Sequence, residues 1–369
     1  MALIVGTVMP SFLAASLAPR IRADFGFGDT ALGVALALFY VVSAAGSIPS
    51  GRLIDRLGAG RGTALVAATT GGCCLGIAVL AQSAATLSAL LLLGGVGNAL
   101  GSPTVSTLLK KEVAGRRHGL AFGAQQSGAS LGALLAGLAL PAVAIPFGWR
   151  WGYVGAAALT LAAAIAAPRW TAEPAAATAR RPRGLTVVHA LGLAAVLASA
   201  AGVGFISFLV TYSVDRGMSE GTAGLLLGGV SLAAACSRIA LGVFADRAGQ
   251  EPLLPVATML AASVAGYVLL IAGEPVVIAV AALSAGALGW AWPGGLNLAV
   301  VQRSPDAPAW AVGVLMTGLF TGAVVGPLVV GVLAEHDLFT AAWITCGAFA
   351  LLAALTLAAT RRREPDRAV

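Results

Sequence analysis

The chain has 369 residues, of which 59% are hydrophobic and only 10% are charged, and its mean hydropathy is +0.92. Soluble domains carry about 25% charged residues, so the composition excludes an ordinary soluble protein. The net charge of +7 does not indicate nucleic-acid binding, because only 6% of the residues are aromatic and no basic patch alternates with stacking side chains. We therefore expect a polytopic membrane protein.

Apolar segments follow one another along the whole chain. A helix needs about 20 mostly apolar residues to cross about 30 Å of hydrocarbon, and the 48 glycines fit helices that approach closely in a membrane. The first segment has no basic region before it, so we expect a helix there rather than a signal peptide. Twelve spans are expected near residues 2–19, 30–50, 63–81, 85–108, 119–146, 151–168, 186–212, 221–244, 253–272, 275–300, 310–333 and 338–360.

Positive charge is unevenly distributed between the two sides of this bundle. If both termini lie in the cytoplasm, 17 of the 22 Lys and Arg residues fall on the cytoplasmic side, four fall outside, and Arg238 lies within a span. This asymmetry predicts a multi-pass protein of the inner or plasma membrane with both ends inside. The four outer residues are Arg20, Arg22, Arg150 and Arg216.

The two halves of the sequence match each other at an offset of 190 or 191 residues. The repeat predicts an N-terminal six-helix bundle at residues 1–168, a cytoplasmic linker at 169–185, a C-terminal six-helix bundle at 186–360 and a cytoplasmic tail at 361–369. Repeated halves of this kind are typical of secondary transporters, with the site near the midplane between them. The matching pairs are Gly51 and Gly242, Asp55 and Asp246, Arg56 and Arg247, Gly58 and Gly249, Pro103 and Pro293, Gly123 and Gly313, Gly128 and Gly318, and Gly132 and Gly322.

One repeated segment resembles a known family. Residues 51–61 read Gly-Arg-Leu-Ile-Asp-Arg-Leu-Gly-Ala-Gly-Arg, which resembles the loop signature between spans 2 and 3 of the major facilitator superfamily, and the pattern recurs between spans 8 and 9. Residues 148–151, Gly-Trp-Arg-Trp, also resemble many members. The resemblance implies an all-α fold of twelve transmembrane helices in two pseudo-symmetric bundles. It also implies a monomeric transporter that works by alternating access.

The signature residues are candidates for gating. The resemblance implies that they form a latch that stabilises the outward-facing state, with Asp55 accepting hydrogen bonds from helix N-terminal amides of the opposite half. The alternative is that these are ordinary loop charges that follow the positive-inside rule. The gating candidates are Gly51, Asp55, Arg56, Gly58 and Arg61 in the first half and Gly242, Asp246 and Arg247 in the second.

Arg238 stands inside an apolar run, where a charge costs roughly 2.5–3.5 kcal/mol on insertion scales. It lies eight residues before Asp246, about 12 Å along a helix at 1.5 Å per residue. Its spacing from Gly242 and Asp246 resembles span 8 of monocarboxylate porters and oxalate/formate exchangers, where the arginine binds the substrate carboxylate. The repeat places Ser47 at the equivalent position of the first half, so the charge is asymmetric. The alternative is an arginine that snorkels to the headgroups or pairs with Asp246 or a backbone carbonyl.

Other polar and aromatic residues of the inner spans are candidates for the wall of a substrate cavity, although each of them could instead bridge helices or face lipid. We expect Asn98 and Gln126 to contact substrate, because buried amides need partners. The remaining expected contacts are Tyr40, Tyr212, Trp290 and Asn297, and further candidates are Ser11, Gln125, Phe205, Trp292, Thr317 and Thr321.

Span 11 carries a glycine stripe, Gly318, Gly322, Gly326 and Gly331, with Pro327 beside it. The stripe resembles the glycine-proline motif of antiporters, but that motif belongs in span 5. We expect tight helix packing and a kink here instead.

The chain lacks several features of other classes. It has no His, Cys and carboxylate cluster, no nucleophile elbow and no phosphate-binding loop, so we expect no enzyme, cofactor or metal site. No acidic residue is expected in the middle of a span, which disfavours drug/proton antiporters that need a membrane carboxylate. The expected partners are the bilayer, a small-molecule substrate, and a coupling proton or counter-anion.

These observations favour a secondary transporter or exchanger of a small organic anion. Efflux of amphipathic neutral or cationic compounds, through a cavity dominated by Trp290, Trp292 and Phe205, is the first alternative. A transporter-like receptor is the second, although the short loops provide no domain for signalling.

The latch hypothesis predicts that Asp55→Asn lowers the transport rate without abolishing ligand binding, because the latch acts on the conformational change and not on the site. Transport into liposomes and ligand binding in detergent measure the two effects separately. An unchanged transport rate would count against the latch.

Overall fold

The computed structural model describes residues 2–109, 118–166, 185–248, 252–304 and 308–362, and this part of the chain is helical almost throughout and contains no strand. A π-helical turn at Leu140–Ala144 and a 3-10 turn at Leu270–Ala272 join longer helices. The α-helices are α1 (Ala2–Ser16), α2 (Ala18–Phe25), α3 (Asp29–Leu80), α4 (Ala84–Leu109), α5 (His118–Ala139), α6 (Ile145–Phe147), α7 (Trp149–Ala166), α8 (Leu185–Asp215), α9 (Glu220–Ala248), α10 (Leu253–Leu269), α11 (Pro275–Gly289), α12 (Trp292–Arg303), α13 (Pro308–Glu335) and α14 (Phe339–Arg362).

Most of the expected spans are present as long apolar helices. Within the described ranges, ten helical segments are long and apolar enough to cross a membrane, and α1 and α2 together would make an eleventh. These two are bent by 63°, because Pro19 in the first turn of α2 cannot donate to the preceding turn. The remaining helix, α7, has 18 residues, about 27 Å at 1.5 Å per residue, and packs against α1 and α3 in the place expected for span 6.

One local expectation was wrong, and one expected span has a break. Residues 51–61 are not an extended loop: α3 continues through them and is broken only at Gly58, whose φ of 78° and ψ of 163° suit a residue without a Cβ. Span 10 is present at Pro275–Arg303, and within it a break at Trp290 and Ala291 separates α11 from α12.

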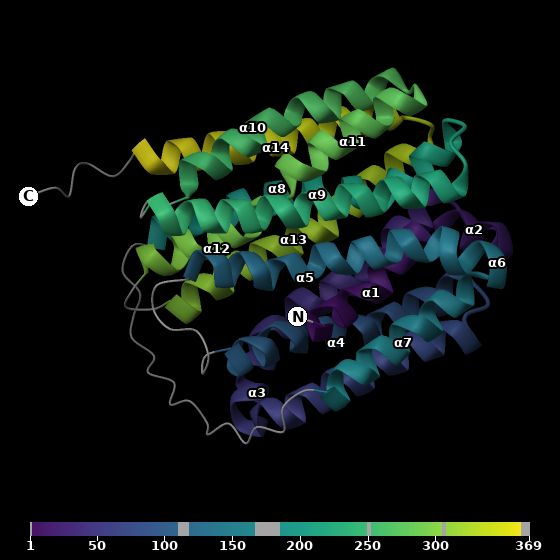
Figure 1. Cartoon of the computed structure of the whole chain (residues 1–369), viewed down its shortest axis with the longest axis horizontal. Coiled ribbons are helices and arrows are strands. Elements are labelled where there is room, and N and C mark those ends of the chain that lie inside the picture. The colour runs from purple at the N-terminus through teal and green to yellow at the C-terminus, as the bar shows by residue number, and fades with distance from the viewer. Residues whose placement is uncertain (1, 110–117, 167–184, 249–251, 305–307, 363–369) are drawn as a thin grey trace, which may run out of the picture.

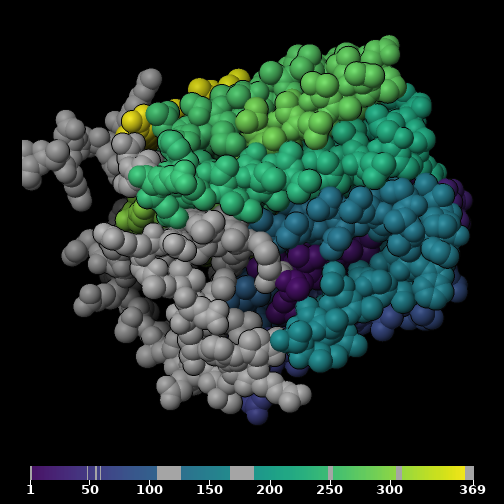
Figure 2. Space-filling model, viewed as in Figure 1, coloured from purple at the N-terminus to yellow at the C-terminus, as the bar shows by residue number. Residues whose placement is uncertain are grey.

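The helices form two bundles, α1–α7 and α8–α14, which lie face to face (Figure 1). They meet mainly along two helix pairs, α3 with α13 and α5 with α9. The space-filling view shows α5, in blue, directly against α9, in green (Figure 2). The repeat relates α5 to α13 and the first part of α3 to α9, so the two interfaces are equivalent to each other.

The repeated glycines bring neighbouring helices close together. A Cβ on Gly132 of α5 would lie 2.4 Å from the Val8 side chain of α1, and a Cβ on Gly322 of α13 would lie 2.0 Å from the Val196 carbonyl oxygen of α8. Gly318 and Gly326 meet carbonyl oxygens of α8 in the same way. The packing interpretation of the stripe in span 11 is therefore confirmed.

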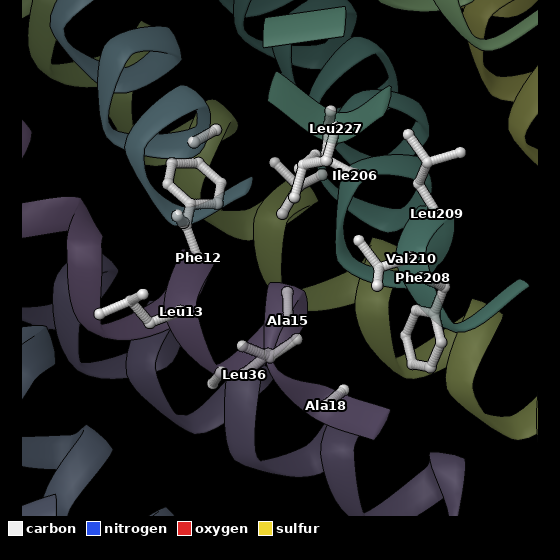
Figure 3. Close-up of a cluster of buried hydrophobic side chains, with 14 of the residues drawn as sticks. Phe12, Leu13, Ala15, Ala18, Leu36, Ile206, Phe208, Leu209, Val210 and Leu227 are labelled. Carbon is white, nitrogen blue, oxygen red and sulfur yellow. The ribbon is translucent and has the colours of Figure 1, made fainter. Parts of the chain in front are cut away.

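The bundles also contact each other through apolar side chains at the end of the molecule where α2 and α6 lie (Figure 1). Figure 3 shows buried side chains of both bundles in this region, among them Phe12 and Leu36 of the first bundle and Ile206 and Leu227 of the second. We call this end the closed end. We call the opposite end, where α7 stops and α8 starts, the linker end, although the linker itself lies outside the described residues.

The close packing of α13 on α8 predicts that Gly322→Ala lowers the stability of the protein by about 1–3 kcal/mol, because the new methyl group overpacks the helix pair. Thermal unfolding in detergent measures the effect. Gly313→Ala, on the same helix, is the matched control, since a Cβ there meets nothing within 4 Å. An equal loss of stability in both variants would contradict the packing argument.

Candidate functional site

A cavity of about 100 Å³ lies between the two bundles. Helices α1, α3, α4 and α5 of the first bundle and α8, α9, α12 and α13 of the second supply its wall, together with Trp290 from the break in span 10. Aromatic and aliphatic side chains predominate among a few polar groups, as in most small-molecule sites. The lining residues are Ile4, Thr7, Val8, Phe12, Tyr40, Asn98, Ser102, Gln126, Ala129, Ser199, Val203, Arg238, Trp290, Trp292, Pro293, Met316, Leu319 and Phe320.

Arg238 is the one charged residue among those that line this cavity. It is 2% exposed. Its Nε donates to the carbonyl oxygen of Trp290 at 2.8 Å, and its Nη1 donates to the carbonyl oxygen of Gln126. The guanidinium carbon also lies 4.8 Å from the centre of the Trp290 ring, a cation–π distance.

Both interpretations of Arg238 therefore have a structural counterpart. The arginine pairs with backbone carbonyls, as the structural alternative allowed, and it faces the cavity, as a substrate contact requires. Among the residues that the structure describes, it has no carboxylate partner. Its contact with Gln126 crosses from the second bundle to the first.

Three other expected contacts line the same cavity. Asn98 of α4 donates from Nδ2 to the hydroxyl of Ser43 at 3.0 Å. The hydroxyl of Tyr40 lies 3.4 Å from that of Ser11. Gln126 lies on α5, one turn before Ser130. The structure thus brings Tyr40, Asn98 and Gln126 together with Arg238 and Trp290 around one space.

Two expected contacts lie elsewhere. Tyr212 packs against Phe339 and Trp343 near the closed end and donates to the carbonyl of Leu270. Asn297 is buried within the second bundle, where its Nδ2 donates to the carbonyl of Pro293 at 2.9 Å.

The further candidates divide in the same way. Trp292 lines the cavity, and Ser11 is the partner of Tyr40. Phe205 packs against Tyr267 and Trp343. Thr317 and Thr321 are exposed and bond carbonyls of their own helix. The side chain of Gln125 lies outside the described residues.

Sequence reasoning missed the face that α1 contributes. Ile4, Thr7, Val8 and Phe12 follow helical spacing and form one stripe toward the cavity. Their spacing was visible in the sequence, but span 1 is mostly apolar on all sides. Its few hydroxyl side chains, at Thr7, Ser11 and Ser16, gave only a weak sign of which stripe points inward.

The whole chain matches one family. The model of the Major Facilitator Superfamily matches residues 1–189 and 191–369. The chain belongs to the major facilitator superfamily. It is a multi-pass membrane transporter rather than an enzyme.

Solved structures of major facilitator transporters share its fold. One is a bacterial homologue of the human lysosomal transporter Spinster in an inward-facing and occupied conformation, with a TM-score of 0.73, 16% identity, and coverage of 98% of this chain and 95% of that one. Another is a point mutant of the nucleoside transporter NupG, with a TM-score of 0.74, 15% identity, and coverage of 97% and 99%. No functionally curated protein matches the chain in sequence. At these identities the likeness concerns the fold alone.

The family signature lies at the linker end, away from the cavity. Arg56, Arg61 and Arg247 are exposed there, Asp246 is partly buried, and Gly242 is buried on α9. The backbone at Gly51 has open space beside it, and Gly58 forms the break in α3. The side chain of Asp55 lies outside the described residues, so its predicted latch contact is not described.

The closed end carries polar contacts between the two bundles that the sequence did not indicate. Arg20 of α2 lies 2.6 Å from Glu220 of α9. Glu335, at the end of α13, accepts a hydrogen bond from the backbone N–H of Thr30 at 3.0 Å, and its carboxylate lies against Gly28. A carboxylate of one bundle therefore caps the N-terminus of a helix in the other, where the helix dipole also favours negative charge.

Removal of this cap should make the closed end open more readily. A lost cap costs about 1 kcal/mol, which corresponds to about a fivefold change in an equilibrium. We expect Glu335→Leu to raise, by about that factor, the rate at which maleimide labels Leu36→Cys, because Leu36 is buried on α3, the helix that packs against α13 of the second bundle. Cys236→Ser removes the exposed native cysteine from the background.

The matched control for this test is Glu274→Leu, which removes an exposed carboxylate that precedes α11 at the same end. Glu335→Gln should have a smaller effect than Glu335→Leu, because the amide oxygen still accepts from Thr30. If Glu335→Leu labels no faster than the control, the cap does not hold the bundles together.

Proposed function

We propose that this transporter moves a small organic anion, a carboxylate, by alternating access, and that Arg238 holds the anionic group in the cavity between the bundles. One observation carries the proposal. A guanidinium that is 2% exposed lies at the cavity without a carboxylate partner among the described residues. Its planar donors match the geometry of a carboxylate.

The energetics of burial support this assignment. A buried cation loses its hydration and must be compensated by hydrogen bonds or opposite charge. Two backbone carbonyls and the face of Trp290 supply partial negative charge, but they do not neutralise the guanidinium. An anion that enters the cavity would supply the missing charge, and Arg238 would in turn replace the water that the anion loses.

The rest of the cavity would recognise the neutral part of the substrate. The rings of Phe12, Trp290, Trp292 and Phe320 offer apolar contact. Tyr40, Asn98 and Gln126 remain proposed polar contacts. Tyr212 and Asn297 are not part of the proposed site, because neither lines the cavity. Tyr212 donates to the Leu270 carbonyl, and Asn297 donates to the Pro293 carbonyl of its own helix.

The proposed orientation follows from the distribution of basic residues. The linker end, with its exposed arginines, would lie in the cytoplasm with both termini, and the closed end would face outward. In that orientation the described conformation is closed to the outside. The signature residues 51–61 and 242–247 would act as the latch of the opposite, outward-facing state. A monomer in the inner or plasma membrane, coupled to a proton or a counter-anion, completes the proposal.

Efflux of amphipathic neutral or cationic compounds is a second candidate. The predominance of aromatic and aliphatic side chains in the cavity favours it, and in that case Arg238 would serve only to hold backbone carbonyls. Phe205, originally expected to contribute to such a cavity, packs within the second bundle instead.

Ligand-induced thermal stabilisation separates the two candidates. A ligand at about 100 times its dissociation constant adds roughly 2.7 kcal/mol of stability. We expect acetate, benzoate or oxalate to stabilise the purified protein, and we expect Arg238→Gln to abolish that stabilisation and the corresponding uptake into liposomes. Arg361→Gln, which removes an exposed arginine near the end of α14, is the matched control and should behave as the unaltered protein.

The same panel contains the contrary outcomes. Stabilisation by benzylammonium or benzamide alone, with Arg238→Gln equal to the unaltered protein, would make the protein an exporter and Arg238 a structural charge. Carboxylate stabilisation that survives in Arg238→Gln would place the anion site elsewhere.

A further inference from the structure

Span 10 is broken at the depth of the cavity, and the break lies beside Arg238. Trp290 follows the last residue of α11 with φ of −115° and ψ of 12°, and α12 begins two residues later at Trp292 with Pro293 in its first turn. Proline has no N–H to donate to the preceding turn. Pro293 therefore leaves the Gly289 carbonyl, four residues earlier, without its helical donor. The Trp290 carbonyl lies between the two helices and accepts a hydrogen bond from another helix.

Arg238 uses this carbonyl and the ring of the same residue. Its Nε donates to the Trp290 oxygen at 2.8 Å, and its guanidinium carbon lies 4.8 Å from the ring centre. The carbonyl also lies at the C-terminal end of α11, where the helix dipole is negative and stabilises a cation. A discontinuous membrane helix whose end faces a charged group is a recurring device at transporter sites.

The indole itself is fixed by its neighbours. Phe12 of α1 packs edge-on against it, with ring centres 5.8 Å apart and an interplanar angle of 86°. On the other side, a Cβ on Gly202 of α8 would lie 2.9 Å from the Trp290 ring. The ring therefore has little freedom to turn away from the guanidinium.

The first half of the chain provides an internal comparison. The repeat equates Pro293 with Pro103, Trp290 with Leu100 and Arg238 with Ser47. Pro103 lies inside α4, which runs without interruption from Ala84 to Leu109. The proline alone therefore does not break the helix, and the break occurs in the half that has the buried cation.

We infer that Trp290 is a positioning residue for Arg238, an inference that rests on the proposed anion site. The Trp290 carbonyl accepts the hydrogen bond from Nε, and the Trp290 ring packs against the guanidinium. A carboxylate can then be held by two donors only at the Nη1 and Nη2 edge. Nη1 at present donates to Gln126 in the other bundle, so an anion at this edge competes for Nη1 with a contact between the bundles.

Binding of benzoate and of its uncharged isostere benzamide tests this inference by calorimetry in detergent. The measured quantity is the ratio of the two affinities, which depends on how well the guanidinium is held and not on the fit of the ring. We expect Trp290→Leu to lower this ratio about tenfold, because the cation–π support is lost, and Trp290→Phe to restore most of it. Trp292→Leu, which removes the neighbouring indole from the same cavity, should change both affinities alike and leave the ratio unchanged.

A double variant decides whether Trp290 acts through Arg238. If it does, Arg238→Gln abolishes the preference for benzoate and Trp290→Leu adds no further loss to it. Additive losses, or an unchanged ratio in Trp290→Leu while Arg238→Gln abolishes the preference, would overturn the positioning role and leave the anion site in place. If the unaltered protein has no preference for benzoate over benzamide, the proposed anion site fails and the positioning role fails with it.

Discussion

The buried charge of Arg238 is the constraint on which the centre of this molecule depends. A guanidinium at this depth must be compensated, and the compensation comes from three directions. The broken helix provides one carbonyl, the opposite bundle provides another, and the Trp290 ring covers one face. Only one of these partners, the Gln126 carbonyl, belongs to the first bundle. The arginine is therefore anchored to one half of the transporter and joined to the other by a single described hydrogen bond.

Close helix packing allows this arrangement to lie between two bundles that still touch. Towards the closed end, Gly137 of α5 faces Gly224 and Gly228 of α9 so closely that a Cβ would lie 2.6 Å from a carbonyl oxygen. Gly33 of α3 meets the Pro327 carbonyl of α13 in the same way. Near the cavity the wall is built from large side chains such as Phe12, Trp290 and Phe320, and these leave space between them. Small residues thus close one end, and bulky ones enclose the site.

The sequence predicted what depends on composition and local pattern. Hydropathy predicted the spans, the repeat predicted two similar bundles, and the isolated charge identified Arg238, which does line the cavity. Properties that depend on distant contacts were not predictable in this way. Tyr212 carries the same polar tip as Tyr40, but its position in its bundle directs it to Phe339 and Trp343. The Glu335 cap joins residues 305 positions apart. The break in span 10 was not predictable from Pro293, because the equivalent proline of the first half lies in an unbroken helix.

The two halves of the chain differ in a way that links substrate binding to the reorientation of the bundles. The scaffold is repeated, since the equivalent helix pairs α3 with α13 and α5 with α9 form the two interfaces. The chemistry is not repeated, because Ser47, the residue equivalent to Arg238, is an uncharged serine that donates to the Ser43 carbonyl of its own helix. With the proposed anion site, the empty carrier must break the Arg238–Gln126 contact to separate the bundles, whereas in the loaded carrier the substrate competes for that donor. A single residue without a counterpart in the first half would then make the barrier to reorientation depend on whether substrate is bound, although the two halves of the scaffold are otherwise similar.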